Sequence, residues 1–152
     1  MSDLPKIDAI IARYEKSEES LLAALQDFQR EFNYVPEDGI KRLSETMNVP
    51  LSKIYAMGTF YKALSLNPRG RHVIKVCTGT ACHLKGADLM VEAIERDLKV
   101  KCGGTTQDKN FTLETVNCVG ACAMAPVVVV GADYHGNISP SKVTDTIKKY
   151  RQ

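Results

Sequence analysis

The chain has 152 residues and a mass of 16.8 kDa, which is enough for one ordinary domain or two small ones. Hydrophobic residues make up 44% and charged residues 25%, the usual proportions of a soluble globular protein, which excludes a disordered tail, a collagen-like fibre and a membrane protein. The formal charge is only +2, so we expect no nucleic-acid binding. No apolar run approaches the roughly 20 residues that a bilayer span needs, so we expect no direct membrane insertion. The amphipathic start of the sequence is not a secretory signal.

The first half of the sequence has the apolar spacing of helices. Apolar residues recur at helical intervals and predict helices over residues 7–14, 21–32, 40–47 and 50–57. Asparagine and proline residues fall in the two later breaks, where helices commonly end. The apolar faces predict the core of a small helical bundle rather than a cofactor site.

The turn at residues 67–70 is the best candidate for a domain boundary, because the hydrophobic period changes after it. The predicted elements beyond it are a strand at 72–76, a helix at 86–98, strands at 111–116 and 127–130, a hairpin tip and return at 134–138, and a helix capped by 139–141. We therefore predict an α+β protein, with an N-terminal all-α helical bundle over residues 1–68 and a C-terminal α/β domain over residues 69–152.

All five cysteines lie in the second half. An odd number in a chain without an export signal argues against a disulfide framework and for metal or redox chemistry. Four of the cysteines form two pairs, Cys77 with Cys82 and Cys118 with Cys122, and each pair follows a predicted strand and encloses glycine and other small residues. Small residues let backbone N–H groups approach sulfur, which stabilises negative charge there.

Four thiolates in two loops are the ligand set of an iron–sulfur cluster or of a structural zinc ion. The spacing favours a 2Fe–2S cluster, because a C-x₄-C opening occurs in such proteins and the C-x₂-C-x₂-C run of many 4Fe–4S sites is absent. Zinc remains open, since intervals of four and three residues are tolerable for it but unusual. Thiol redox chemistry also remains open, although the thioredoxin-type C-x-x-C is missing.

Further stretches of the sequence add to the two cysteine pairs. They are Thr59-Phe60-Tyr61, Pro68-Arg69-Gly70, Val76-Cys77, Gly86-Ala87, Gly104-Thr105-Thr106, Phe111-Thr112-Leu113 and Ala125-Pro126-Val127-Val128. Together they resemble the thioredoxin-like 2Fe–2S subunit family of NAD(P)-linked oxidoreductase complexes, over nearly the whole chain. That family includes the small iron–sulfur subunit of respiratory complex I and subunits of NAD-dependent hydrogenases and formate dehydrogenases, electron-bifurcating ones among them.

The resemblance implies a thioredoxin-like fold for the C-terminal domain and places the ligands of one 2Fe–2S cluster at Cys77, Cys82, Cys118 and Cys122. It implies a cytoplasmic one-electron carrier with no substrate site of its own, either soluble or on the cytoplasmic arm of a membrane complex. The carrier works beside a flavoprotein subunit that binds FMN and NAD(H), and beside further iron–sulfur subunits. The chain ends soon after its last predicted helix, which favours a soluble hydrogenase or formate dehydrogenase over respiratory complex I.

The remaining candidate residues have plainer interpretations. Cys102 lies away from both pairs and is expected to be a bystander thiol. His83 follows Cys82 directly but is expected to face solvent rather than to tune a cluster. No Ser-His-Asp order, zinc-protease motif or nucleotide-binding loop is present in the sequence. The helical half, residues 1–68, is the candidate docking surface for the flavoprotein, with exposed aromatic positions near Phe60 and Tyr61. The alternative for these two residues is a place in an interdomain core.

Overall fold

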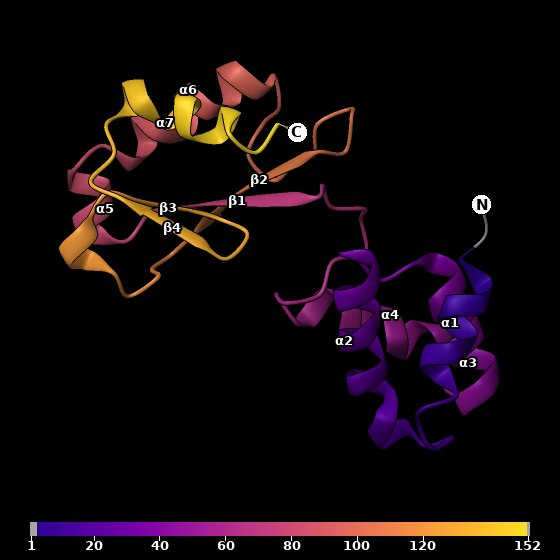
Figure 1. Ribbon diagram of the computed structural model, residues 1–152. Helices are drawn as coiled ribbons and strands as arrows, with labels where there is room; N and C mark the ends of the chain where they lie inside the picture. The colour runs from indigo at the N-terminus through magenta and orange to yellow at the C-terminus, as the bar shows by residue number, and fades with distance from the viewer. Residues whose placement is uncertain (1–2, 152) are drawn as a thin grey trace. The chain divides into compact units, whose positions relative to one another are not determined.

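The computed structural model describes residues 3–151, and the chain divides into two compact units, Met1–Pro68 and Arg69–Gln152. The first unit (Figure 1) consists of α1 (Leu4–Ile11), the short 3-10 helix η1 (Glu18–Ser20), α2 (Leu21–Phe32), α3 (Glu37–Met47) and α4 (Leu51–Phe60). α1 packs on α2 and α3, and α3 packs on α4. Their apolar faces bury one cluster of side chains, in which Leu25, Phe28 and Ile54 are fully enclosed.

The ends of these helices differ in places from the predicted bounds. α1 ends at Ile11 rather than at Tyr14, because the N–H of Tyr14 bonds only three residues back and so tightens the last turn. The side chain of Tyr14 is directed at α2, where its hydroxyl donates to Asp27 at 2.7 Å. α2 and α3 stop at Asn33 and Asn48, which adopt left-handed backbone angles with φ of 63° and 53°. Asparagine tolerates that conformation better than most residues and commonly ends a helix.

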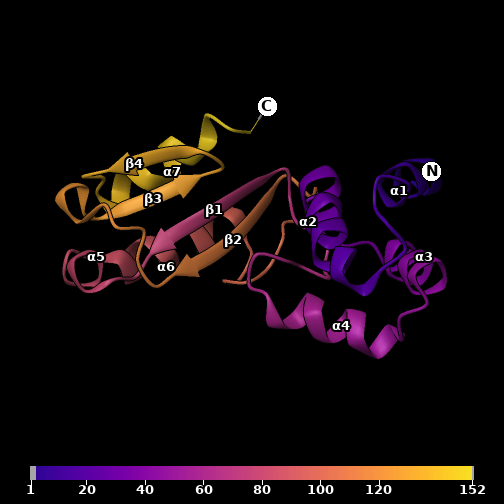
Figure 2. The same cartoon turned by 90° about the horizontal axis from the view of Figure 1, so that it is seen from below.

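The second unit is a mixed sheet with helices packed on it. Its elements are β1 (His72–Cys77), α5 (Thr80–Leu84), α6 (Ala87–Leu98), β2 (Phe111–Val116), the 3-10 helix η2 (Cys122–Met124), β3 (Val127–Val130), β4 (Asp133–Gly136) and α7 (Pro140–Lys148). The strand order is β2-β1-β3-β4, in which β1 and β2 are parallel and the other neighbours antiparallel. α6 and α7 lie together on one face of the sheet (Figures 1 and 2).

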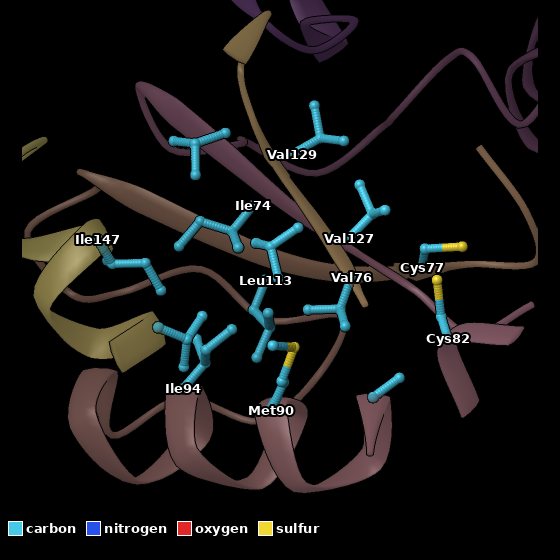
Figure 3. Packing of buried hydrophobic residues seen from close by; sticks show 14 of the residues in the cluster. Ile74, Val76, Cys77, Cys82, Met90, Ile94, Leu113, Val127, Val129 and Ile147 are labelled. Carbon is cyan, nitrogen blue, oxygen red and sulfur yellow. The ribbon is translucent and has the colours of Figure 1, made fainter. Parts of the chain in front are cut away.

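The core of the second unit lies between that face and the two helices. Ile74 and Leu113, opposite each other on β1 and β2, point toward Met90 and Ile94 of α6 and toward Ile147 of α7 (Figure 3). The alternation of buried side chains along β1 follows from the two-residue period of a strand. Burial of these side chains fixes which face of β1 is turned inward.

Two predictions in the second unit were wrong in detail. The residues between the first two cysteines are not only a loop, because Thr80–Leu84 form the short helix α5. The hairpin tip lies at residues 131–132, not at 134–138: Val130 pairs with Asp133, and Gly131 adopts a φ of 61° that a tight two-residue turn requires. Residues 133–136 are strand β4 instead.

Across residues 3–151, none of the helices combines the length and the apolar character that crossing a bilayer requires.

Candidate metal centre

The two cysteine-bearing segments leave the sheet at the same edge. β1 and β2 are parallel neighbours, and Cys77 is in register with Val116. Cys77 is the last residue of β1 and Cys82 lies in α5, whereas Cys118 follows β2 closely and Cys122 opens η2. Because parallel strands have their carboxyl ends at one edge of a sheet, this pairing brings both cysteine pairs to one place.

The sulfur of Cys77 is the most connected atom of the group. The backbone N–H groups of Gly79 and Val119 donate to it, and the thiols of Cys82 and Cys118 are within hydrogen-bonding reach. Burial by itself raises the pKa of the Cys77 thiol, but these donors together outweigh it and hold that pKa below its ordinary value. The thiolate form, which is the form that binds metals, is therefore easier to form at this position than in an ordinary cysteine.

Cys82 is buried beside Cys77, and the two sulfurs face each other (Figure 3). Burial raises the pKa of the Cys82 thiol, and the neighbouring Cys77 and the charge on Cys122 raise it further. The N–H of Val127, at the start of β3, donates to this sulfur and opposes that shift. A bound metal would remove the repulsion among these sulfurs, because its positive charge stabilises each of them as a thiolate.

The loops that carry the two pairs meet at Gly79. A Cβ at this position would lie 2.9 Å from the carbonyl oxygen of Asn117 and 3.4 Å from the Cβ of Cys118, so the approach depends on glycine. Gly120 has a φ of 78° and donates its N–H to the sulfur of Cys118 at 3.3 Å. One glycine therefore lets the loops touch, and the other turns an N–H toward a sulfur.

The donor set of the group fits a 2Fe–2S core. Cys77, Cys82, Cys118 and Cys122 are all free thiols, the first two buried and the last two exposed. Within residues 3–151, no three His, Cys, Asp or Glu side chains converge on a point where one metal ion could sit. A 2Fe–2S core does not need such a point, because four cysteine ligands are divided between two irons. The N–H groups directed at the sulfurs are the kind of contact that stabilises such a core.

Cys102 and His83 lie outside this group. The N–H of Cys102 donates to Glu95 at 2.9 Å, and its sulfur lies 3.8 Å from the hydroxyl of Thr115, so neither contact is with a cysteine of the two pairs. The His83 side chain is 59% exposed, and its Nδ1 lies 3.0 Å from the Asp88 carboxylate. His83 thus faces solvent, as predicted.

Some contributors to the site were not identified from the sequence. The N–H of Val127 donates to the sulfur of Cys82, and the ammonium of Lys85 donates to the carbonyl of Ala125 at 3.2 Å. Both contacts join segments that are far apart in the sequence. Gly136 is a third contributor, because a Cβ there would lie 2.5 Å from the Cβ of Met124 in η2. A glycine inside a strand is a signal of such close approach, and it could have indicated this contact.

Comparison with known proteins supplies the family. The profile of the thioredoxin-like [2Fe-2S] ferredoxin family matches residues 7–151, and the chain belongs to this family. Among its relatives, the NADP-reducing hydrogenase subunit HndA of Solidesulfovibrio fructosivorans is 38% identical over 135 residues, 89% of this chain and 79% of the relative. A subunit of the NADH-quinone oxidoreductase of Rhizobium meliloti (strain 1021) is 34% identical over 146 residues, 96% of this chain and 87% of the relative.

A solved structure shares the fold. The crystal structure of an NAD+-reducing [NiFe]-hydrogenase in the air-oxidized state matches 87% of this chain with a TM-score of 0.71 and 20% identity, and this chain spans 23% of the hydrogenase chain. At that identity the likeness concerns the fold alone. The predicted family and the α+β class are confirmed, and membership of a [2Fe-2S] family supports the 2Fe–2S interpretation over zinc or thiol redox chemistry.

Proposed function

We propose that this chain is a one-electron carrier subunit of a multisubunit NAD(P)-linked oxidoreductase, and that Cys77, Cys82, Cys118 and Cys122 hold its single 2Fe–2S cluster. The observation that carries the proposal is that both pairs of free thiols lie where the parallel strands β1 and β2 end, with Cys77 within reach of Cys82 and Cys118. When bound, the cluster supplies reversible one-electron exchange.

The residues around the thiols prepare the site for that exchange. The N–H groups of Gly79, Val119, Gly120 and Val127 point at cysteine sulfurs and stabilise negative charge, which increases when an electron arrives. The buried first pair keeps water from one side of the site, and the exposed second pair leaves the other side open. Electrons then enter and leave on the side of the second pair. Neither step calls for a protein acid or base, which fits a subunit without a substrate site of its own.

The names of the relatives guide the choice of parent complex. HndA is named as a subunit of an NADP-reducing hydrogenase, and it is 38% identical to this chain. The relative from NADH-quinone oxidoreductase, at 34%, supports the equivalent place in that complex as the alternative. In either complex the partners are a flavoprotein subunit that carries FMN and binds NAD(H), together with further iron–sulfur subunits. We place the chain in the cytoplasm, soluble or on the cytoplasmic arm of a membrane complex.

We further propose that the exposed aromatic pair at the end of α4, Phe60 and Tyr61, docks on the flavoprotein. Phe60 is 78% exposed, and the ring of Tyr61 meets it edge-on with 5.1 Å between centroids. Exposed aromatic side chains in contact with each other are typical of the centre of a protein interface.

The docking proposal is tested by copurification from the native host. Phe60→Asp in the tagged chain should reduce the recovered flavoprotein about tenfold or more, because a charge replaces an interface aromatic. Tyr134→Asp, which changes another exposed aromatic in the second unit, is the matched control and should leave recovery unchanged. Equal recovery with Phe60→Asp and with the unmodified chain would contradict the assignment of this aromatic pair.

The cluster is tested by colour. The purified chain should be red-brown, hold two irons per chain, and lose its visible absorption when dithionite reduces it. Cys118→Ser should remove the colour, whereas Cys102→Ser should keep it, since Cys102 has no contact with the four thiols. A colourless chain that holds one zinc ion would overturn the proposed function.

A further inference from the structure

Lys85 is bonded to both cysteine-bearing segments. Its backbone N–H donates to the carbonyl of Cys82 at 3.1 Å, and its ammonium donates to the carbonyl of Ala125 at 3.2 Å. The N–H of Ala125 donates in turn to the carbonyl of Cys122 at 3.1 Å. A continuous series of hydrogen bonds therefore runs from Cys82 to Cys122 through the side chain of Lys85.

This contact differs from those of other lysines in the chain. Five of those pair with a carboxylate: Lys6, Lys41, Lys53, Lys101 and Lys148. Over residues 3–151 no ion pair of Lys85 is found, and the carboxylate of Asp88 close by in the sequence is held by His83. The charge of Lys85 is thus not neutralised by a neighbour, and it lies where the two cysteine loops join.

We propose that Lys85 is a positioning residue with an electrostatic role: it fastens the Cys122 loop to α5, and its charge stabilises the reduced cluster over the oxidised one. The inference rests on the proposed function. Four thiolates make a 2Fe–2S site anionic, and reduction adds one electron without changing the ligands. A fixed positive charge close by favours the more negative state. The carbonyl of Ala125 that holds the ammonium is buried, whereas Lys85 is itself exposed, so solvent screens part of that charge.

The test compares three variants of the full chain. Lys85→Met removes the charge and the donors, Lys85→Arg keeps both, and Lys148→Met removes a distant lysine on α7 as the control. The midpoint potential is measured by titration with dithionite, followed by visible absorption. Hydrogen exchange of the amides at residues 118–125 is measured on the cluster-free chain and reports on the loop alone.

With Lys85→Met, the ratio of reduced to oxidised cluster at a fixed potential should fall roughly three- to tenfold, a tenfold fall being about 59 mV for one electron. Amides 118–125 should exchange several-fold faster. Lys85→Arg should restore both quantities, and Lys148→Met should change neither. If Lys85→Met does not retain a cluster, Lys85→Gln, which keeps an N–H donor without the charge, provides the potential measurement.

An unchanged potential in Lys85→Met, or in Lys85→Gln in its place, overturns the inference even if the loop exchanges faster, because Lys85 would then be only a structural clamp. Unchanged hydrogen exchange at residues 118–125 in Lys85→Met overturns the inference as well, because the ammonium would then not hold the loop in place. A colourless unmodified chain is a different result: it overturns the proposed function, while the exchange data on the cluster-free chain still decide whether Lys85 holds the loop.

Discussion

The two cysteine pairs have very different surroundings, although we assign them to one cluster. Cys77 and Cys82 are 2% and 1% exposed and belong to the hydrophobic core of the second unit, whereas Cys118 and Cys122 are exposed. Cys77 ends a strand that has neighbours on both sides. Cys118 and Cys122 lie instead in the connection between β2 and β3.

The difference shows that the two pairs are held in place by different forces. Core packing holds the first pair, so its position is as stable as the sheet itself. Close contacts at two glycines hold the second pair, since Gly79 lies against Asn117 and Gly136 lies against Met124. A site built in this way combines one rigid side with one side that is open to a partner.

The largest expected effect comes from removing the core support of the first pair. Ile74 is fully buried three residues before Cys77 and points toward α6 and α7 (Figure 3). Ile74→Ala should lower the free energy of unfolding of the second unit by about 2–5 kcal/mol, because it leaves a cavity. Guanidinium unfolding of the cluster-free chain, followed by circular dichroism, measures the loss.

Leu25→Ala is the matched control for that change, because Leu25 is equally buried in the first unit. It should destabilise the first unit by a similar amount and leave the visible spectrum of the loaded chain intact. If Ile74→Ala kept the full stability of the second unit, the dependence of the first pair on core packing would be refuted.

A smaller effect is expected where the two loops touch. Gly79→Ala places a methyl group 2.9 Å from the carbonyl oxygen of Asn117 and should displace the segment that carries Cys118, at a cost of about 1–3 kcal/mol. The rate of iron loss to a chelator should rise accordingly. Gly103→Ala is the control, because Gly103 has a φ of 87° and open space around it. It should carry a backbone penalty but lose iron no faster than the unmodified chain.

The exposure of the pairs is directly measurable by alkylation. In the cluster-free chain, a maleimide should modify Cys118 and Cys122 about tenfold or more faster than Cys77 and Cys82, since access limits the reaction of buried thiols. Peptide mass spectrometry separates the sites, and exposed Cys102 supplies an internal standard. Equal rates at all four positions would remove the distinction between a buried and an open side.

The spacing of hydrophobic residues along the sequence was sufficient to predict most strands and helices of the second unit. The β-branched run before Cys77 and the run from Val127 to Val130 are strands, because a buried strand needs side chains of that kind. α5 was missed because a helix of one turn has no apolar period to detect. Gly136 was mistaken for part of a hairpin tip, whereas it accommodates Met124 and Gly131 makes the turn.

The cysteine pattern and the family resemblance named the four proposed ligands, which lie on segments that leave the sheet where β1 and β2 end, but not what surrounds them. Lys85 meets the carbonyl of Ala125 across 40 positions of sequence. The N–H of Val127 meets Cys82 in the same way, through the pairing of β3 with β1. No local pattern encodes such contacts, because they depend on which strands become neighbours.

The smallest expected effect concerns β4, on which the second cysteine loop rests. The Tyr150 hydroxyl donates to Asp133 at 2.8 Å; since it has a single hydrogen, His135 Nε2, also at 2.8 Å, must donate its own N–H to the Tyr150 oxygen. Asp133 and His135 belong to β4, and Gly136 at its end contacts Met124. Tyr150→Phe removes both bonds and should lower the free energy of unfolding of the second unit by about 0.5–1.5 kcal/mol.

The dependence on pH separates this role from simple packing. Burial, and then the hydrogen bond to Asp133, raise the pKa of Tyr150 above its ordinary value. A group whose pKa is higher in the folded state contributes its stability below the unfolded value, about 10, and loses it as the pH rises through the folded value. The stability difference between the unmodified chain and Tyr150→Phe should therefore be constant from about pH 7 to 9 and shrink above about pH 10.

Tyr14→Phe is the control in the first unit, where the hydrogen bond to Asp27 raises the tyrosine pKa. If Tyr150→Phe were as stable as the unmodified chain at every pH, ring packing rather than the hydroxyl would account for the contribution of Tyr150 to β4.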